Sequence, residues 1–258
     1  MHTAWYRNFQ RGIDHCLPMQ CVLCDQCFRP SRPDHLCAFC RLALPLNIHA
    51  CRHCALPLDS ERPTHDENES TGCANPVCGA CLSKPLADRA MVPLLHTGPA
   101  AHLIHRLKFS KGETEGLTLA QTMLTHINLL PSAEHPDLLV PVPMAYRSAV
   151  RRGFNQSVAL ASHIAHALKL PVAADLLKRR GGPAQHTLSG AKRQHLAASS
   201  FQWRSRHATR SLQGAHVAVV DDVLTTGATA REIIKILRHH GAIRVDIWCA
   251  TRTPHPQA

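Results

Sequence analysis

The chain has 258 residues, 45% hydrophobic and 4% aromatic, enough for one α/β domain with an aliphatic core and a small appendage. No apolar run reaches the roughly 18–20 residues that span a bilayer, and the start of the chain lacks the apolar segment of a secretory signal, so we expect a cytoplasmic protein without a membrane span. The net charge of +11 comes from residues 91–258, because residues 1–90 hold nine basic and nine acidic side chains. This basic part favours nucleic acid or small molecules with several phosphates.

The first predicted element is a cysteine-rich module over residues 1–90, which contains eleven of the twelve cysteines. In a chain without an export signal they indicate metal ligation rather than disulfides, because the cytosol keeps thiols reduced. Four C-x-x-C pairs have the arrangement of a double zinc ribbon, and a site closed by four thiolates is structural. The predicted ligands are Cys21, Cys24, Cys37 and Cys40 in a first set and Cys51, Cys54, Cys78 and Cys81 in a second.

The remaining cysteines leave alternatives open. Cys73 could replace one ligand of the second set, while Cys16 and Cys27 are spare thiols. Cys249 lies in an apolar run and is interpreted as a small buried hydrophobe. We therefore expect one or two structural zinc ions. The module either packs over an active site or serves as a docking surface for a partner or nucleic acid.

Helical and extended patterns alternate from residue 91 to the end of the chain. Apolar residues at helical spacing, short apolar runs and turn residues mark the elements. Their alternation predicts an α/β fold with a doubly wound, mostly parallel sheet over residues 91–258. Helices are expected over 101–109, 114–130, 155–168 and 229–240, and strands over 137–143, 171–177, 216–222 and 243–251.

Residues 217–229, VAVVDDVLTTGAT, form the most informative run. Four apolar β-formers predict a buried strand, and Asp221 and Asp222 follow at its carboxyl end, where ligands bind in open α/β sheets. A turn rich in hydroxyls and glycine then opens a helix, whose first free N–H groups favour an anion. A phosphate site beside carboxylates that accept from sugar hydroxyls indicates a phosphorylated ribose. The motifs of P-loop and dinucleotide-binding proteins do not occur in the sequence.

This run resembles the motif that binds 5-phosphoribosyl-1-pyrophosphate (PRPP) in type I phosphoribosyltransferases, and all 13 positions agree. Residues 140–156, VPVPMAYRSAVRRGFNQ, resemble the VPVP loop, arginine and RGFNQ element of the ComF/GntX family of competence-associated phosphoribosyltransferase-like proteins. Ala145 and Tyr146 depart from the family's usual His-Pro. The resemblance covers nearly the whole chain and implies the type I phosphoribosyltransferase fold behind the zinc module.

The resemblance implies a position for each part of PRPP. Asp221 and Asp222 would take the ribose hydroxyls and help to organise Mg²⁺, and Arg147 would act with them in catalysis. Lys108 matches the family's Leu-Lys-aromatic element, and Gln185 matches a Q-x-x-L element in a mobile loop, although Lys108 could equally be an ordinary surface lysine. The other implied residues are Thr225, Thr226, Gly227, Ala228 and Thr229 for the 5′-phosphate and Val142, Pro143, Met144, Arg147 and Arg152 for the pyrophosphate.

The acceptor of the phosphoribosyl group is not named by these motifs. Hypoxanthine–guanine enzymes carry an Asp where this chain has Thr225, which cannot accept a proton at neutral pH. Either another group does that work, or the nucleophile is already anionic, or no transfer occurs. Two functions stay open: a transferase acting on an unknown acceptor, and a PRPP-binding regulator or competence factor that handles single-stranded DNA. A partner from the competence machinery and a homodimer are compatible with both.

Overall fold

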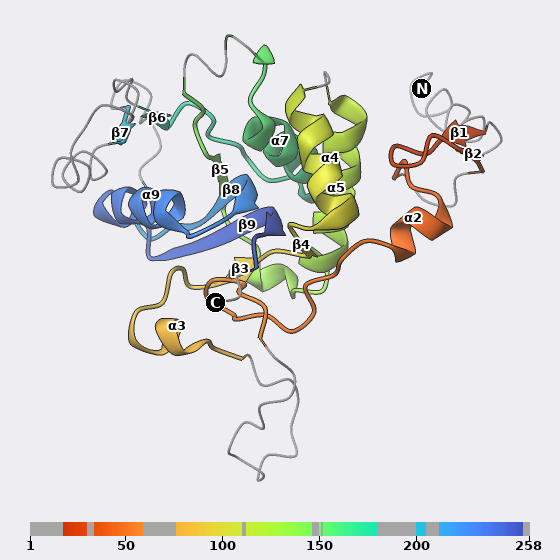
Figure 1. The fold of residues 1–258 in the computed structure, drawn as a ribbon. Helices are drawn as coiled ribbons and strands as arrows, with labels where there is room; N and C mark the ends of the chain where they lie inside the picture. Colours follow the sequence, from red (N-terminus) through yellow and green to blue (C-terminus); the bar gives the residue numbers. More distant parts are fainter. Residues whose placement is uncertain are drawn as a thin grey trace, which may run out of the picture.

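A parallel sheet of five strands forms the centre of the computed structural model (Figure 1). The structure describes residues 18–29, 34–58, 76–109, 112–145, 150, 152–179, 200–204 and 212–254. The strand order is β3-β9-β8-β5, and β4 also pairs with β9. The strands are β3 (Ala90–Met91), β4 (Leu94–Leu95), β5 (Leu138–Pro141), β8 (His216–Leu224) and β9 (Arg244–Arg252).

The two long central strands, β8 and β9, are buried on both faces because helices cover the sheet from both sides (Figure 1). One face packs against α4 (Gly98–Phe109), α5 (Glu113–Ile127) and α7 (Gln156–Leu168), and the other packs against α9 (Ala228–His239). The continuous Val, Ile and Ala runs of these strands fit this double burial. The α/β class and the parallel sheet predicted from the sequence are confirmed.

Several predicted boundaries shift in the structure. The predicted strand over 171–177 is wrong: Val172 makes only an isolated parallel bridge with Leu139, and the chain turns at residues 174–175. Pro171 lacks an N–H for a ladder, which limits pairing there. The strand expected over 216–222 continues to Leu224. Two further short strands, β6 (Leu177–Arg179) and β7 (Phe201–Trp203), form an antiparallel pair.

The cysteine-rich segment contains only short elements in its described part. β1 (Met19–Gln20) and β2 (Cys27–Phe28) form a hairpin. α2 (Ala38–Leu42) and α3 (Gly79–Ser83) are short helices of five residues. Outside this segment, a 3₁₀ turn, η1 (Ser132–Glu134), precedes β5. In Figure 1 the hairpin and α2 lie to one side of the sheet, whereas α3 lies close to its β3 edge. None of the helices in the described ranges is long and apolar enough to cross a bilayer.

Candidate functional site

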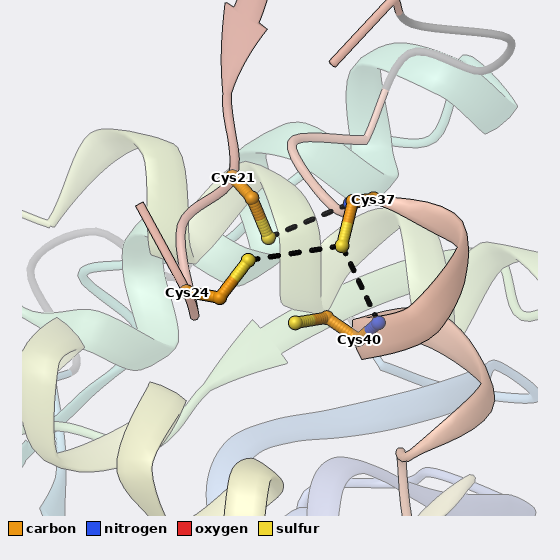
Figure 2. A group of neighbouring side chains, drawn as sticks. All are labelled: Cys21, Cys24, Cys37 and Cys40. Carbon is orange, nitrogen blue, oxygen red and sulfur yellow. Dashed lines mark hydrogen bonds between the residues drawn. The ribbon is translucent and has the colours of Figure 1, made fainter. Parts of the chain in front are cut away.

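The first four-cysteine cluster is built from the β1–β2 hairpin and the start of α2. Figure 2 shows Cys21, Cys24, Cys37 and Cys40 pointing toward one another. Their four Sγ atoms lie within 4.8 Å of one another, and the Cys24 and Cys37 Sγ atoms are 3.8 Å apart. Four thiolates at a Zn–S distance of about 2.3 Å occupy tetrahedron corners about 3.8 Å apart. The cluster is therefore compatible with a structural zinc ion.

The second cluster has the same geometry but is fully buried. Cys51, Cys54, Cys78 and Cys81 also have their Sγ atoms within 4.8 Å of one another, with 3.7 Å between those of Cys54 and Cys78. These are the two ligand sets that the spacing predicts. Cys73 and Cys16 lie outside the described residues. Cys27 is exposed, and Cys249 is buried in β9 as expected.

Backbone amides prepare one thiol of each cluster for metal ligation. Burial opposes ionisation of Cys21, but N–H donors, above all that of Cys37 at 3.5 Å, outweigh it and lower the pKa of Cys21 to about 6. Cys51 is likewise opposed by burial, and the N–H of Cys78 at 3.3 Å helps to lower its pKa. Because the thiolate is the metal-binding form, both clusters carry a ligand biased toward it.

The connection between β8 and α9 is the segment predicted to bind the 5′-phosphate, and it is called the phosphate loop below. Residues 223–230, with Val142 and Asp221, line a cavity of about 60 Å³. Gly227 has φ 75°, in the left-handed region that favours glycine, and turns the chain into the helix. Within the described residues, no acceptor is bonded to the amides of Thr225, Thr226 or Gly227. The first amide of α9, that of Ala228, donates to Thr226 Oγ1 at 3.4 Å. Unbonded amides at the start of a helix are typical of an anion site.

Asp221 lies beside this cavity near the carboxyl end of β8. Its Oδ1 accepts hydrogen bonds from the Ser157 hydroxyl at 2.8 Å and from the Asp222 amide at 2.9 Å. Burial raises the pKa of Asp221 to about 7, and the charge of Asp222 adds to the rise, while the two hydrogen bonds oppose it. The two hydrogen bonds fix the orientation of the Asp221 carboxyl, and its raised pKa lets it gain or lose a proton near neutral pH.

Asp222 points toward a second group of side chains on the α4 side. Its Oδ2 pairs with Lys108 Nζ at 3.1 Å, so the structure brings the predicted Lys108 to the acidic pair. Thr251 Oγ1 donates to the Asp222 carbonyl at 3.3 Å and lies 3.1 Å from Nδ1 of His96. When the Thr251 hydroxyl donates to the Asp222 carbonyl, Nδ1 of the neutral His96 ring is the donor to Thr251, and Nε2 keeps a free electron pair. Burial, aided by Lys108 and opposed by Asp222, lowers the pKa of His96 and favours this neutral form.

The predicted pyrophosphate loop follows β5 and is only partly described. Val142 lines the cavity, and its carbonyl accepts from Nδ2 of the Asn155 side chain at 3.0 Å, which ties the loop to the start of α7. The Asn155 side chain also caps α7 by accepting from the Ser157 amide. Pro143 and Met144 are half-buried, whereas Arg147 and Gln185 lie outside the described residues.

Arg152 belongs to the same predicted set but points to α4. Its guanidinium lies 6.0 Å from the ring centre of Phe109, the residue after Lys108. No contact between Arg152 and the phosphate loop is recorded within the described ranges. A guanidinium over an aromatic ring keeps its positive charge. The role of Arg152 at the pyrophosphate stays a prediction, and the structure places its side chain beside α4.

Four residues at the site were not predicted from the sequence. Ser157 directly follows the RGFNQ element, and reading the motif one residue further would have included it. Arg252 ends an apolar strand at the ligand-binding edge, which is a usable signal for a buried cation. His96 and Thr251 carry no such signal, because only strand pairing brings the residue after β4 beside the end of β9.

Comparison with known proteins relates the chain to a family model and to several named proteins. Residues 154–258 match the family model of the phosphoribosyl transferase domain. The chain is 32% identical over 238 residues to DNA utilization protein YhgH of Salmonella typhi, covering 90% of this chain and 97% of that protein. It is 29% identical to competence protein F of Haemophilus influenzae over 180 residues, 68% of this chain and 78% of that one. Among solved structures, purine phosphoribosyltransferase from Pyrococcus horikoshii gives a TM-score of 0.32 at 15% identity, covering 66% of this chain and 81% of that chain.

The extent of these matches exceeds the phosphoribosyltransferase region alone. The alignment with YhgH reaches over almost the full length of both proteins, at an identity that marks common descent. The chain therefore belongs to the family of DNA utilization protein YhgH and competence protein F (ComF), and it carries a phosphoribosyltransferase domain.

Proposed function

We propose that this protein binds PRPP together with Mg²⁺ and transfers its phosphoribosyl group to an acceptor. The observation that carries the proposal is the phosphate loop: three unpaired amides and a helix N-terminus surround a cavity that Asp221 also lines. Amide donors and a carboxylate acceptor are thus offered to one ligand in the same cavity. A phosphorylated ribose needs both, the first for its 5′-phosphate and the second for its hydroxyls.

Each part of PRPP then has its own group of residues. Residues 225–229 bind the 5′-phosphate, and Asp221 and Asp222 accept from the ribose hydroxyls. Lys108 neutralises Asp222 in the free protein, at 3.1 Å, and is close enough to turn to a pyrophosphate when ligand arrives. Val142, held by Asn155, begins the loop that faces the pyrophosphate, with Pro143, Met144, Arg147 and Arg152 completing it.

Transfer develops positive charge on ribose C1 as the bond to pyrophosphate breaks, so the protein's task is to orient both phosphate ends while excluding water. Mg²⁺, when bound with PRPP, neutralises the diphosphate as it leaves. The paired carboxylates at the site are oxygen donors of the kind that Mg²⁺ prefers. Ser157 contributes by fixing the Asp221 carboxylate through its 2.8 Å hydrogen bond. His96 Nε2 is a neutral base at the same sheet edge and offers the proton acceptor that Thr225 lacks.

Calorimetric titration of the protein with PRPP and Mg²⁺ tests this function. We expect wild-type protein to bind and Asp221→Asn to bind at least tenfold more weakly, because an amide is a poorer acceptor for ribose hydroxyls. Glu113→Gln is the matched control, since it removes an exposed carboxylate at the start of α5. Equal affinity of wild type and Asp221→Asn would contradict the assignment. Release of pyrophosphate with a panel of bases and amines then measures turnover.

A second candidate function is a PRPP-binding regulator that handles single-stranded DNA inside the cytoplasm, alone or with a partner of the competence machinery. Two observations favour it: the relatives are named for DNA utilization and competence, and the whole net charge of +11 arises from residues 91–258. PRPP that is bound but never consumed, with DNA affinity that falls steeply as salt rises, would support this regulator. Sedimentation at several protein concentrations would show whether either form works as a homodimer.

A further inference from the structure

Arg252, the last residue of β9, is a buried cation without an acidic partner in the described part of the chain. Only 8% of its surface is exposed. Its guanidinium donates to four main-chain carbonyls: Nε to Cys54 at 2.9 Å, and Nη1 to Leu224 at 3.1 Å and to Thr225 and Thr253 at 2.6 Å each. Burying a charge without a counter-charge is costly, so its retention here calls for an explanation in terms of ligand binding.

The first part of that explanation lies in the orientation of two peptide groups. In a trans peptide the C=O and the N–H of the next residue point in opposite directions, and the described residues contain no cis bond. By holding the carbonyls of Leu224 and Thr225, Arg252 aims the amides of Thr225 and Thr226 away from itself. Those are two of the three unpaired amides of the phosphate loop. The guanidinium therefore presents the donors that an incoming phosphate needs.

The second part is the connection to the buried metal cluster. Cys54, whose carbonyl accepts from Arg252 Nε, is a member of the second four-cysteine set. From the same segment, Leu86 covers the loop from outside: a Cβ at Gly227 would lie 2.6 Å from its Cδ2. One ligand of the second cluster thus accepts from the cation that aligns the loop, and Leu86, beside the turn of the loop, belongs to the same hydrophobic core as the four cysteines.

We propose that Arg252 is a positioning residue that couples the second four-cysteine cluster to the phosphate loop, so that a zinc ion at the cluster sets the loop's affinity for the phosphate end of PRPP. This proposal rests on the proposed function. Zinc bound by Cys54 would fix the position of the Cys54 carbonyl, and Arg252, bonded to that carbonyl, would fix the carbonyls of Leu224 and Thr225.

Arg252→Met and Arg252→Lys test the coupling by calorimetry with PRPP and Mg²⁺. We expect the methionine variant to lose at least thirtyfold in affinity and the lysine variant about tenfold, because an ammonium keeps the charge but cannot span the same carbonyls. Arg204→Met, which removes an exposed arginine, should bind as wild type does. If wild type fails to bind PRPP, the proposed function is wrong. If wild type binds and both Arg252 variants bind equally well, only this inference is wrong.

Leu86→Ala and zinc competition keep the inference testable should Arg252→Met not fold. Leu86→Ala frees the turn at Gly227 and should weaken PRPP binding three- to tenfold, with two zinc ions per chain retained. Coupling is reciprocal, so saturating PRPP should strengthen binding of the second-cluster zinc against a competing chelator and leave the first cluster unchanged. A purely structural Arg252 would give no such selective effect, and equal zinc affinity with and without PRPP would overturn the coupling.

Discussion

The two four-cysteine clusters share a ligand set and a spacing but differ in what surrounds them. The second is buried and belongs to the same hydrophobic core as α9, Val142, Val219 and Leu224. In the first, only Cys21 is fully buried, and Cys24 is exposed. Identical coordination chemistry therefore has two structural settings, and only the second reaches the phosphate loop.

The difference arises from the main chain that follows each cluster. Around the second, Ala90 of β3 donates to the Arg52 carbonyl at 2.7 Å, and Asn47 donates to the Ala55 and Val92 carbonyls, so the cysteine turns are hydrogen-bonded to the sheet edge. Around the first, the described polar link to the helices is the 3.8 Å pair of Asp25 with Arg106. The comparison teaches that cysteine spacing predicts a metal site but not its importance for the fold.

Loss of one cysteine ligand should affect stability very differently at the two clusters, and this is the largest difference that we expect. Cys54→Ser removes a ligand that lies in the hydrophobic core. We expect loss of the cooperative unfolding transition, because the free energy of metal binding contributes to folding at such a site. Cys24→Ser removes an exposed ligand and should lower the melting temperature by only a few degrees, roughly 1 kcal/mol. Thermal unfolding with zinc analysis measures both. Equal losses would show that the clusters are equivalent.

Two glycines test whether the second cluster's segment contacts the phosphate loop: Gly227 lies in the loop, and Gly79 lies between two of the cysteine ligands. Gly227→Ala places a side chain at φ 75° and against Leu86, and should cost about 2–3 kcal/mol of unfolding free energy. Gly79→Ala, between Cys78 and Cys81, meets nothing within 4 Å and should be neutral or stabilising by up to about 1 kcal/mol. Denaturant titration measures the unfolding free energy of both variants. An equal loss in Gly79→Ala and Gly227→Ala would mean that Leu86 does not restrict the phosphate loop at Gly227.

The raised pKa of Asp221, beside the phosphate loop, should make the free energy of unfolding depend on pH. Its carboxyl holds a proton up to pH about 7 in the native protein, against an ordinary value of 3.8, so the native state binds more protons between these values. Stability then falls as pH rises through this window. Asp221→Asn removes the effect and should be more stable than wild type at pH 8, by about 1–2 kcal/mol, while equalling it near pH 4. Thermal unfolding across pH tests this; parallel curves for the two proteins would exclude it.

The smallest effect is expected at the periphery of the first cluster. Asp25→Asn breaks the pair with Arg106 and keeps a residue that tolerates the left-handed conformation at φ 58°. Because the pair is 3.8 Å long and largely exposed, the unfolding free energy should change by less than about 0.5 kcal/mol. A loss above 1 kcal/mol in urea titration, roughly twice that bound, would mean that the first cluster is as firmly integrated as the second.

The sequence alone predicted the local parts of this protein and its family. Cysteine spacing predicted both ligand sets, because a tetrahedral thiolate site needs two close pairs. The run ending in residues 225–229 predicted strand, turn and helix, since apolar β-formers, glycine and hydroxyl residues each favour one local conformation. The VPVP and RGFNQ elements indicated the family, which the relatives confirm. The boundary near residue 90 and the PRPP roles of the named residues stay predictions.

Tertiary structure decided which of these parts act on one another. Composition separated the cysteine-rich segment from the sheet, yet the second cluster shares the core of β8 and β9. Only strand pairing brings His96 to Thr251, and only packing brings the Cys54 carbonyl to Arg252. Such contacts join residues 155 and 198 positions apart. Local patterns carry no record of them, because burial and long-range hydrogen bonds depend on the whole fold.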